Sequence, residues 1–336
     1  MTRPIRLATV MGPCVAIALA ANVAAATELK LTHVQNPNSV TGQGVDMFAE
    51  KVAEYTDGEV TVRVYPASQL GNNKENVSSV RTGTVPMGVV TYPLLADIVP
   101  EFSIYNAGYF YEDEEGLRRV LDSAELGQTW NQQLLERGGL RILESSYYGR
   151  RNLTTGDTPV RTLDDVAGMK IRAVPNEISL AIIRGMGATP TPVPFSELFQ
   201  ALRQGVVDGQ ENPLPTIEAN KFYEVQNYLM LTGHQLIVLP MVINEAAWQE
   251  LSPEAQEAIQ RAADEAQAWI TAATKAKEEE LVSVLADAGM TVIGPEDGLD
   301  VEAFRQAVQA EVAATFDGPK WPDDLVERVL EVASTN

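Results

Sequence analysis

The chain has 336 residues, 45% of them hydrophobic and 21% charged, a balance typical of a folded protein of about two domains. Its 46 acidic and 25 basic side chains give a formal net charge of −21, which disfavours binding to nucleic acid and to anionic membrane surfaces. One cysteine and two histidines exclude an intramolecular disulfide and a thiolate zinc site.

Residues 1–26 have the features of an export signal. Arg3 and Arg6 precede an apolar, alanine-rich run, and Ala24-Ala25-Ala26 supplies the small residues that signal peptidase requires. The run is interrupted by Gly12-Pro13 and is shorter than the ~20 apolar residues of a membrane span. The sequence therefore predicts an exported protein whose signal peptide, residues 1–26, is cleaved after about Ala26.

The segment that follows alternates strands with helices. Leu29–Leu31, Val60–Val64 and Met87–Val90 are predicted as strands, with helices from Val45 to Tyr55 and from Asn73 to Arg81 between them. This βαβαβ order implies a mostly parallel sheet with helices on its faces.

The same pattern restarts near Tyr148 and indicates a second α/β lobe. The strands expected there are Lys170–Val174, Thr189–Val193 and one that opens at Val206-Val207, with helices Glu177–Met186 and Ser196–Gln204 between them.

Two features close the chain. Leu236–Ile243 is apolar enough for a buried strand. Ser252-Pro253 begins a helical pattern that continues to about Ala288 and, if unbroken, is about 54 Å long, enough to cross both lobes. Two helices with an unmarked break remain the alternative.

No enzyme signature is present. The sequence has no GxSxG, Walker or HExxH motif, and no GxGxxG opens a helix after a strand. His33 and His234 are far apart in the chain and are interpreted as residues bonded to backbone. We therefore predict a protein that is not an enzyme and that has no metal and no cofactor.

A binding role is indicated by polar residues near strand ends of the second lobe. Arg172 lies near the carboxyl end of its strand, where open α/β sheets collect ligands, and a guanidinium there can grip a carboxylate with two hydrogen bonds. Asn212 offers both a donor and an acceptor. Taken alone, an arginine at a strand end is more often simply solvated, and an asparagine before proline is ordinarily a turn residue.

The same segments resemble the DctP family, the solute-binding proteins of tripartite ATP-independent periplasmic (TRAP) transporters. The likeness is carried by GMKIRAVPN, by the run VDGQENP followed by KFYEVQ, and upstream by VYPASQLGNNKENVSSVRTG and GRRNLTT. It covers essentially the whole chain after the signal peptide and is weakest after about Gly289.

The resemblance implies a two-lobed periplasmic binding protein fold with a hinge and a long lobe-spanning helix. The first lobe would comprise residues 27–148 and about 238–278, and the second residues 149–237 and about 279–336. The protein, expected to be a monomer, would close over a small organic acid and deliver it to the membrane subunits of a TRAP permease. A ligand sensor that docks to a membrane receptor is the alternative.

The resemblance also assigns roles to residues of the second lobe. Arg172 would form the carboxylate salt bridge, and Arg151 would be a second basic contact, with the adjacent Arg150 as the alternative register. Asn212 would hydrogen-bond the ligand and Phe195 would form an apolar wall.

The first-lobe residues expected to contact the rest of the ligand are His33, Gln35, Thr91 and Tyr92. They are polar and include no second cation, which favours a hydroxylated monocarboxylate such as a uronate or aldonate over a C4-dicarboxylate. Where sialate-binding members carry a glutamate, this chain has Val90-Thr91-Tyr92, which disfavours sialic acid.

Overall fold

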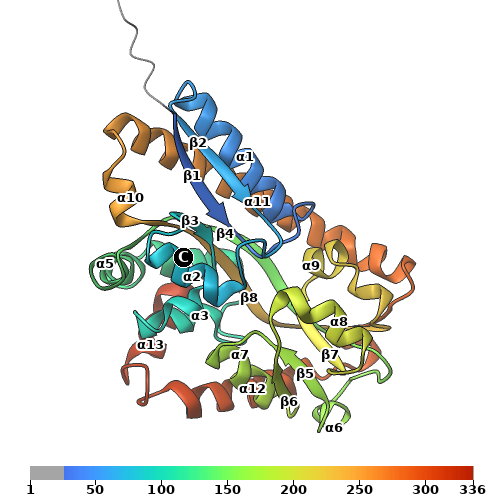
Figure 1. Ribbon diagram of the computed structural model, residues 1–336. Helices are drawn as coiled ribbons and strands as arrows, with labels where there is room; N and C mark the ends of the chain where they lie inside the picture. The colour runs from blue at the N-terminus through green and yellow to red at the C-terminus, as the bar shows by residue number, and fades with distance from the viewer. Residues whose placement is uncertain (1–25, 336) are drawn as a thin grey trace, which may run out of the picture.

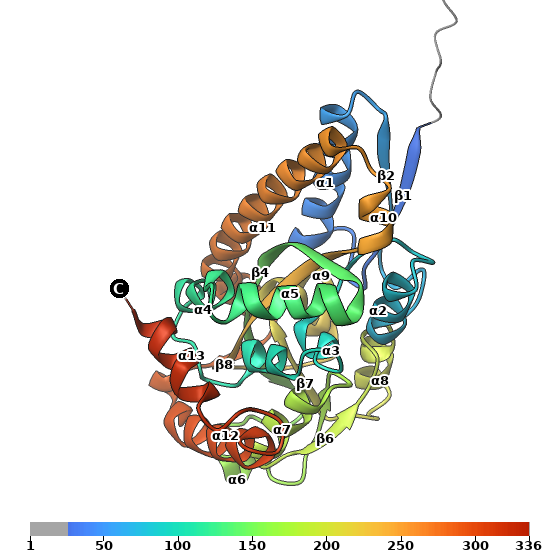
Figure 2. The ribbon, with the colours of Figure 1, turned by 90° about the vertical axis from the view of Figure 1, so that its left-hand side faces the viewer.

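A computed structural model describes residues 26–335, so nearly all of the predicted signal peptide lies outside the described residues. The strands form one sheet of nine, in the order β2-β1-β3-β8-β4-β7-β5-β6, with β9 paired to β8 (Figure 1). Helices cover both faces of this sheet, as expected of an α/β protein (Figures 1 and 2).

The first lobe begins as the sequence predicts. β1 (Thr27–Thr32) pairs in parallel with β2 (Val60–Tyr65) and with β3 (Met87–Val89). The intervening helices are α1 (Val40–Tyr55) and α2 (Asn73–Arg81). Both helices have polar N-caps, because the side chains of Ser39 and Asn72 accept from backbone N–H groups of the first turn.

The second lobe repeats this arrangement. β5 (Lys170–Ala173) pairs in parallel with β6 (Thr189–Pro192) and with β7 (Gly209–Pro213), which starts later than the predicted Val206. Its helices are α6 (Leu163–Val166), α7 (Glu177–Gly185), α8 (Leu198–Arg203) and α9 (Leu214–Ala219).

Two long strands, β4 (Leu140–Thr155) and β8 (Tyr228–Asn244), join the lobes. They pair antiparallel along their whole length, and β3 and β7 pair antiparallel with their outer edges. The two-lobed α/β class is confirmed, but the parallel sheets of the lobes are halves of one mixed sheet.

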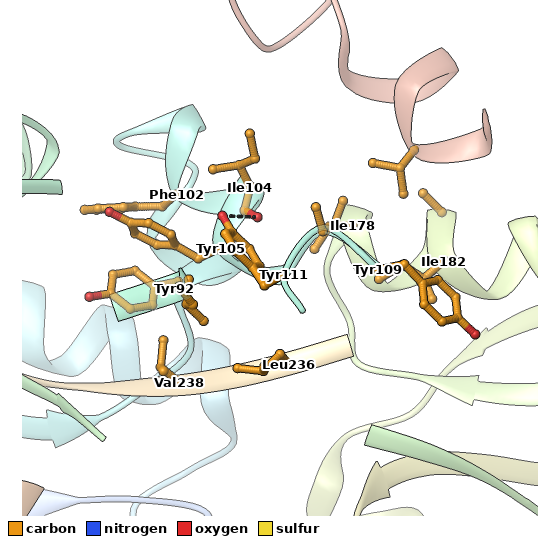
Figure 3. Packing of buried hydrophobic residues seen from close by; sticks show 14 of the residues in the cluster. Tyr92, Phe102, Ile104, Tyr105, Tyr109, Tyr111, Ile178, Ile182, Leu236 and Val238 are labelled. Carbon is orange, nitrogen blue, oxygen red and sulfur yellow. Dashed lines mark hydrogen bonds between the residues drawn. The ribbon is translucent and has the colours of Figure 1, made fainter. Parts of the chain in front are cut away.

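The connection from β3 to β4 is helical and buries an aromatic cluster. It contains α3 (Tyr92–Leu95), a 3-10 turn at Pro100–Asn106, α4 (Glu114–Asp122) and α5 (Gly127–Gly138). The rings of Tyr92 and Tyr105 meet edge to face with centroids 4.7 Å apart (Figure 3). Such packing fixes the segments that enter the space between the lobes.

The C-terminal third crosses between the lobes twice. After the short α10 (Glu245–Gln249), α11 (Pro253–Asp287) is an unbroken helix of 35 residues that contacts α1, β4 and α9. β9 (Thr291–Ile293) then leads to α12 (Val301–Phe316) and α13 (Leu325–Ser334). α12 packs on α7, whereas α13 packs on α4, an element of the predicted first lobe (Figure 2).

None of the described helices has the length and apolar character that crossing a membrane would require.

Candidate functional site

A cavity lies where the two lobes meet at the middle of the sheet. Its walls come from the carboxyl ends of β1, β3 and β5, from β7, and from the central strands β4 and β8. Ligand sites in open α/β sheets occupy this position.

Most residues predicted as ligand contacts line this cavity. They are Gln35, Thr91, Arg151, Arg172, Phe195 and Asn212.

Arg172 is the most deeply buried cation, with only 1% of its surface exposed. Its Nε donates to the Val193 carbonyl at 2.9 Å, and its guanidinium lies over the ring of Phe195, 5.9 Å from the centroid. Nη1 has no hydrogen-bond partner among residues 26–335. Burial, together with the nearby Arg151, lowers the pKa of Arg172 to about 10, so the side chain is still charged at neutral pH. A buried guanidinium with free donors is suited to an anion.

Arg151 faces the same cavity but is already neutralised. Its guanidinium forms a buried ion pair with Glu211, with Nη2 donating to Oε1 at 2.8 Å. Burial alone would raise the pKa of Glu211, but Arg151 and a hydrogen bond from His234 outweigh it and lower the pKa to about 2. Arg150 does not line the cavity, and its guanidinium bonds the Gly233 and Glu112 carbonyls.

His234 completes this network at a distance from the cavity. Because an ionised carboxylate only accepts hydrogen bonds, Nε2 of His234 carries the proton that bonds Glu211 at 3.1 Å. Nδ1 then accepts from the Thr232 hydroxyl at 2.8 Å. Burial lowers the pKa of His234, so its ring is neutral and fixes the Glu211 carboxylate without cancelling its charge.

Asn212 and Phe195 occupy the second-lobe wall. The Asn212 amide donates to Gln210 and leaves its oxygen available beside the cavity. Phe195 packs between the Arg172 guanidinium and the ring of Phe222. The arrangement provides one polar contact and one apolar wall next to the charged group.

On the first-lobe side, buried polar atoms without partners gather at the cavity. They are Oε1 of Gln35, Oδ1 of Asn73, Oγ1 of Thr91 and Oδ1 of Asn106. Leaving a buried polar group unbonded costs about 1–3 kcal/mol, so such a concentration indicates groups that await a ligand.

Two predicted contacts lie elsewhere. The ring of Tyr92 is buried in the aromatic cluster and its hydroxyl bonds the Ser145 hydroxyl at 2.7 Å, so Tyr92 is a core residue (Figure 3). His33 is fully buried behind Gln35, and burial lowers its pKa to about 4. Neither residue lines the cavity.

The structure adds polar residues that the sequence did not single out. They are Asn73, Asn106, Tyr148, Asn176, Ser179 and Gln235. Within residues 26–335, no group of histidine, cysteine, aspartate and glutamate side chains is placed to hold a metal ion.

A mixed α/β sheet in two lobes, with a polar cavity between them that is lined by a buried cation, is the architecture of a solute-binding protein. Residues 31–318 match the sequence profile of bacterial extracellular solute-binding protein family 7, DctP. The chain therefore belongs to this family, whose members include the solute-binding proteins of TRAP transporters.

Individual relatives cover nearly the whole chain. The sialic acid-binding periplasmic protein SiaP of Vibrio cholerae is 34% identical over 87% of this chain and 89% of its own. A TRAP periplasmic solute-binding protein of Actinobacillus succinogenes with bound L-galactonate superposes with a TM-score of 0.86 at 30% identity, covering 92% and 99%. One from Sulfurospirillum deleyianum with bound succinate gives 0.84 at 29% identity, covering 91% and 99%.

Proposed function

We propose that this protein captures a hydroxylated sugar acid, such as an aldonate or uronate, by a salt bridge between the ligand carboxylate and Arg172. The observation that carries the proposal is the guanidinium of Arg172, which is 1% exposed and lines the cavity, and whose Nη1 has no hydrogen-bond partner among the described residues. A carboxylate would supply the missing partner, and an uncharged analogue would leave the cation unpaired.

The rest of the cavity favours hydroxyl groups over a second carboxylate. Arg151 is neutralised by Glu211, so Arg172 is the one lining cation among the described residues that no carboxylate already pairs. The unpartnered oxygens of Gln35, Asn73 and Asn106 can accept hydrogen bonds from ligand hydroxyls, whereas a second carboxylate would offer them no donor. The relative with L-galactonate supports this class, and the relative with succinate represents the alternative.

Delivery is the second part of the proposal. The ligand would be enclosed by hinge closure of the two lobes in the periplasm, and the closed protein would present it to the membrane subunits of a TRAP permease. Support comes from two relatives that are named as periplasmic binding proteins, SiaP of Vibrio cholerae and DctP of Rhodobacter capsulatus. The export signal predicted in residues 1–26 supports it as well.

A thermal-shift screen of ligand-free protein against aldonates, uronates, C4-dicarboxylates, 2-oxo acids and sialate tests the proposal. A ligand at 100 times its Kd adds about 2.7 kcal/mol, which raises the Tm by several degrees. We expect such a shift with sugar acids and a loss of affinity of about two to three orders of magnitude in Arg172→Ala, since a buried pair is broken.

Arg203→Ala is the matched control, because Arg203 is an exposed second-lobe arginine outside the cavity. It should bind as the wild type does. Absence of a shift with every carboxylate, from protein shown by mass spectrometry to be ligand-free, would contradict the proposal. A shift confined to C4-dicarboxylates would refute the sugar-acid class alone.

A further inference from the structure

The strand β4 is irregular where it passes the ligand cavity. Its register with β8 shifts between Tyr147 and Gly149, which pair with the consecutive residues Val238 and Ile237. Tyr148 is therefore an extra residue opposite a single step of β8, which defines a β-bulge.

This bulge decides which side chains reach the cavity. Residues directly opposite each other in an antiparallel pair project to the same side of the sheet. Arg151 lies opposite Gln235, and Gln235 lines the cavity. In a regular strand, Tyr148 and Arg151 would project to opposite sides because they are three residues apart, yet both line the cavity. Without the bulge, Arg150 would take the place of Arg151.

The bulge is held by the long helix α11. β7 pairs with β4 only from Arg151 onward, so the preceding edge of β4 has no neighbouring strand. Side chains of α11 bond this edge instead. Thr271 accepts from the Tyr147 N–H at 3.2 Å, and Oε1 of Glu278 accepts from the Arg150 N–H at 2.6 Å. Because they are seven residues apart, Thr271 and Glu278 lie on one face of the helix, on either side of the bulge.

Glu278 is fitted closely to this backbone. Its Oε2 accepts from the Tyr147 hydroxyl at 2.8 Å, so one carboxylate bridges both ends of the bulge. Gly149 has a φ of +123°, a conformation that favours glycine. A Cβ at Gly149 would lie 2.9 Å from Oε1 of Glu278 and 2.7 Å from the Pro213 side chain. A residue larger than glycine at position 149 would therefore collide with the Glu278 carboxylate that holds the bulge.

We propose that Glu278, outside the cavity, is a positioning residue for ligand binding: it fixes the β4 bulge that directs Arg151, in place of Arg150, into the site beside Tyr148. The inference rests on the proposed function, since it concerns the affinity of the same cavity for its acid. Glu278 acts through β4 and makes no contact with the ligand.

Isothermal titration with the sugar acid that gives the largest thermal shift provides the test. Glu278→Ala leaves the Arg150 N–H without its acceptor, and we expect its Kd to rise at least about tenfold. Glu278→Gln keeps a carbonyl oxygen for this N–H and should restore most of the affinity. Glu280→Ala removes an exposed carboxylate of the same helix and should bind as the wild type does.

A cycle with Arg151→Ala separates positioning from a general loss of stability. If Glu278 acts through Arg151, adding Glu278→Ala to Arg151→Ala should weaken binding far less than it does in the wild type. Equal affinity in Glu278→Ala and Glu280→Ala, or full additivity in the cycle, would overturn the inference. Should Glu278→Ala not fold, the cycle is run with Glu278→Met, which keeps the length of the side chain but removes the acceptor, and full additivity overturns the inference in the same way. A wild-type protein that binds no acid would instead contradict the proposed function.

Discussion

Two buried carboxyl groups on neighbouring strands show how a cation decides the charge of an acid. Glu211 has Arg151 and His234 as partners, and its pKa is lowered to about 2 despite burial. Glu144 in β4 accepts hydrogen bonds only from the Ser146 hydroxyl, at 2.9 and 3.0 Å, and burial raises its pKa to about 8. At neutral pH, Glu211 is charged and Glu144 is largely protonated.

Glu144 should therefore make stability depend on pH. Its unfolded pKa is near 4.5 and its folded pKa is about 8, so between these values the folded state binds the proton and the unfolded state does not. The free energy of unfolding then falls as pH rises through this window. Glu144→Gln should remove that part of the slope, so its Tm relative to wild type should be higher at the upper end of the window than at the lower end. Parallel Tm curves for the two proteins would contradict the assignment.

Some residues of the cavity can be recognised from the sequence, and others cannot. Arg172 and Asn212 are recognisable because they stand near the ends of predicted strands. Asn73 and Asn106 have no such signal, since one begins a helix and the other ends a 3-10 turn. An asparagine at a helix start usually indicates a cap. Their place beside Arg172 is set by the tertiary arrangement of the lobes, which local patterns do not encode.

At the scale of elements, strands whose apolar and polar residues alternate were predictable, and the central strand β4 was not. Val60, Val62 and Val64 alternate with polar residues, and β2 was predicted nearly to its ends. β4 has three register shifts and is buried along most of both faces, including Glu144 and Ser146. Because bulges break the two-residue period and burial on both faces removes polarity contrast, the sequence of β4 does not predict a strand.

The pairing of α1 with α11 depends on close approach of the two helices. A Cβ at Gly44 would lie 2.1 Å from Cγ1 of Ile270, a side chain that is 1% exposed. Gly44→Ala should therefore lower the free energy of unfolding by about 1–3 kcal/mol, measured by urea denaturation.

The partner substitution Ile270→Ala opens a cavity and should by itself cost about 2–5 kcal/mol. In the double variant the new methyl group occupies part of that space, so the loss should be smaller than the sum of the single losses. Additive losses would show that Gly44→Ala acts elsewhere than on this contact.

At the scale of the whole molecule, the chain passes between the lobes at three places. β4 and β8 form the first, α11 the second, and the segment between α12 and α13 the third (Figure 1). In this last segment Lys320 pairs with Glu177 of α7, while the Trp321 indole donates to the Ser103 hydroxyl at 2.8 Å on the first-lobe side. The hinge closure proposed for ligand capture would therefore have to bend all three connections.

The net charge of −21 makes a prediction for the whole protein. Excess carboxylates repel one another more strongly in the folded chain than in the expanded unfolded chain. Raising NaCl from about 10 mM to about 150 mM shortens the screening length from about 30 Å to about 8 Å, which weakens this repulsion. The Tm of the ligand-free protein should therefore rise with NaCl. The rise should shrink as pH falls toward the ordinary carboxyl pKa values, because protonation removes the same charges. A Tm that falls with salt would instead mean that the ion pairs seen among residues 26–335 outweigh the repulsion.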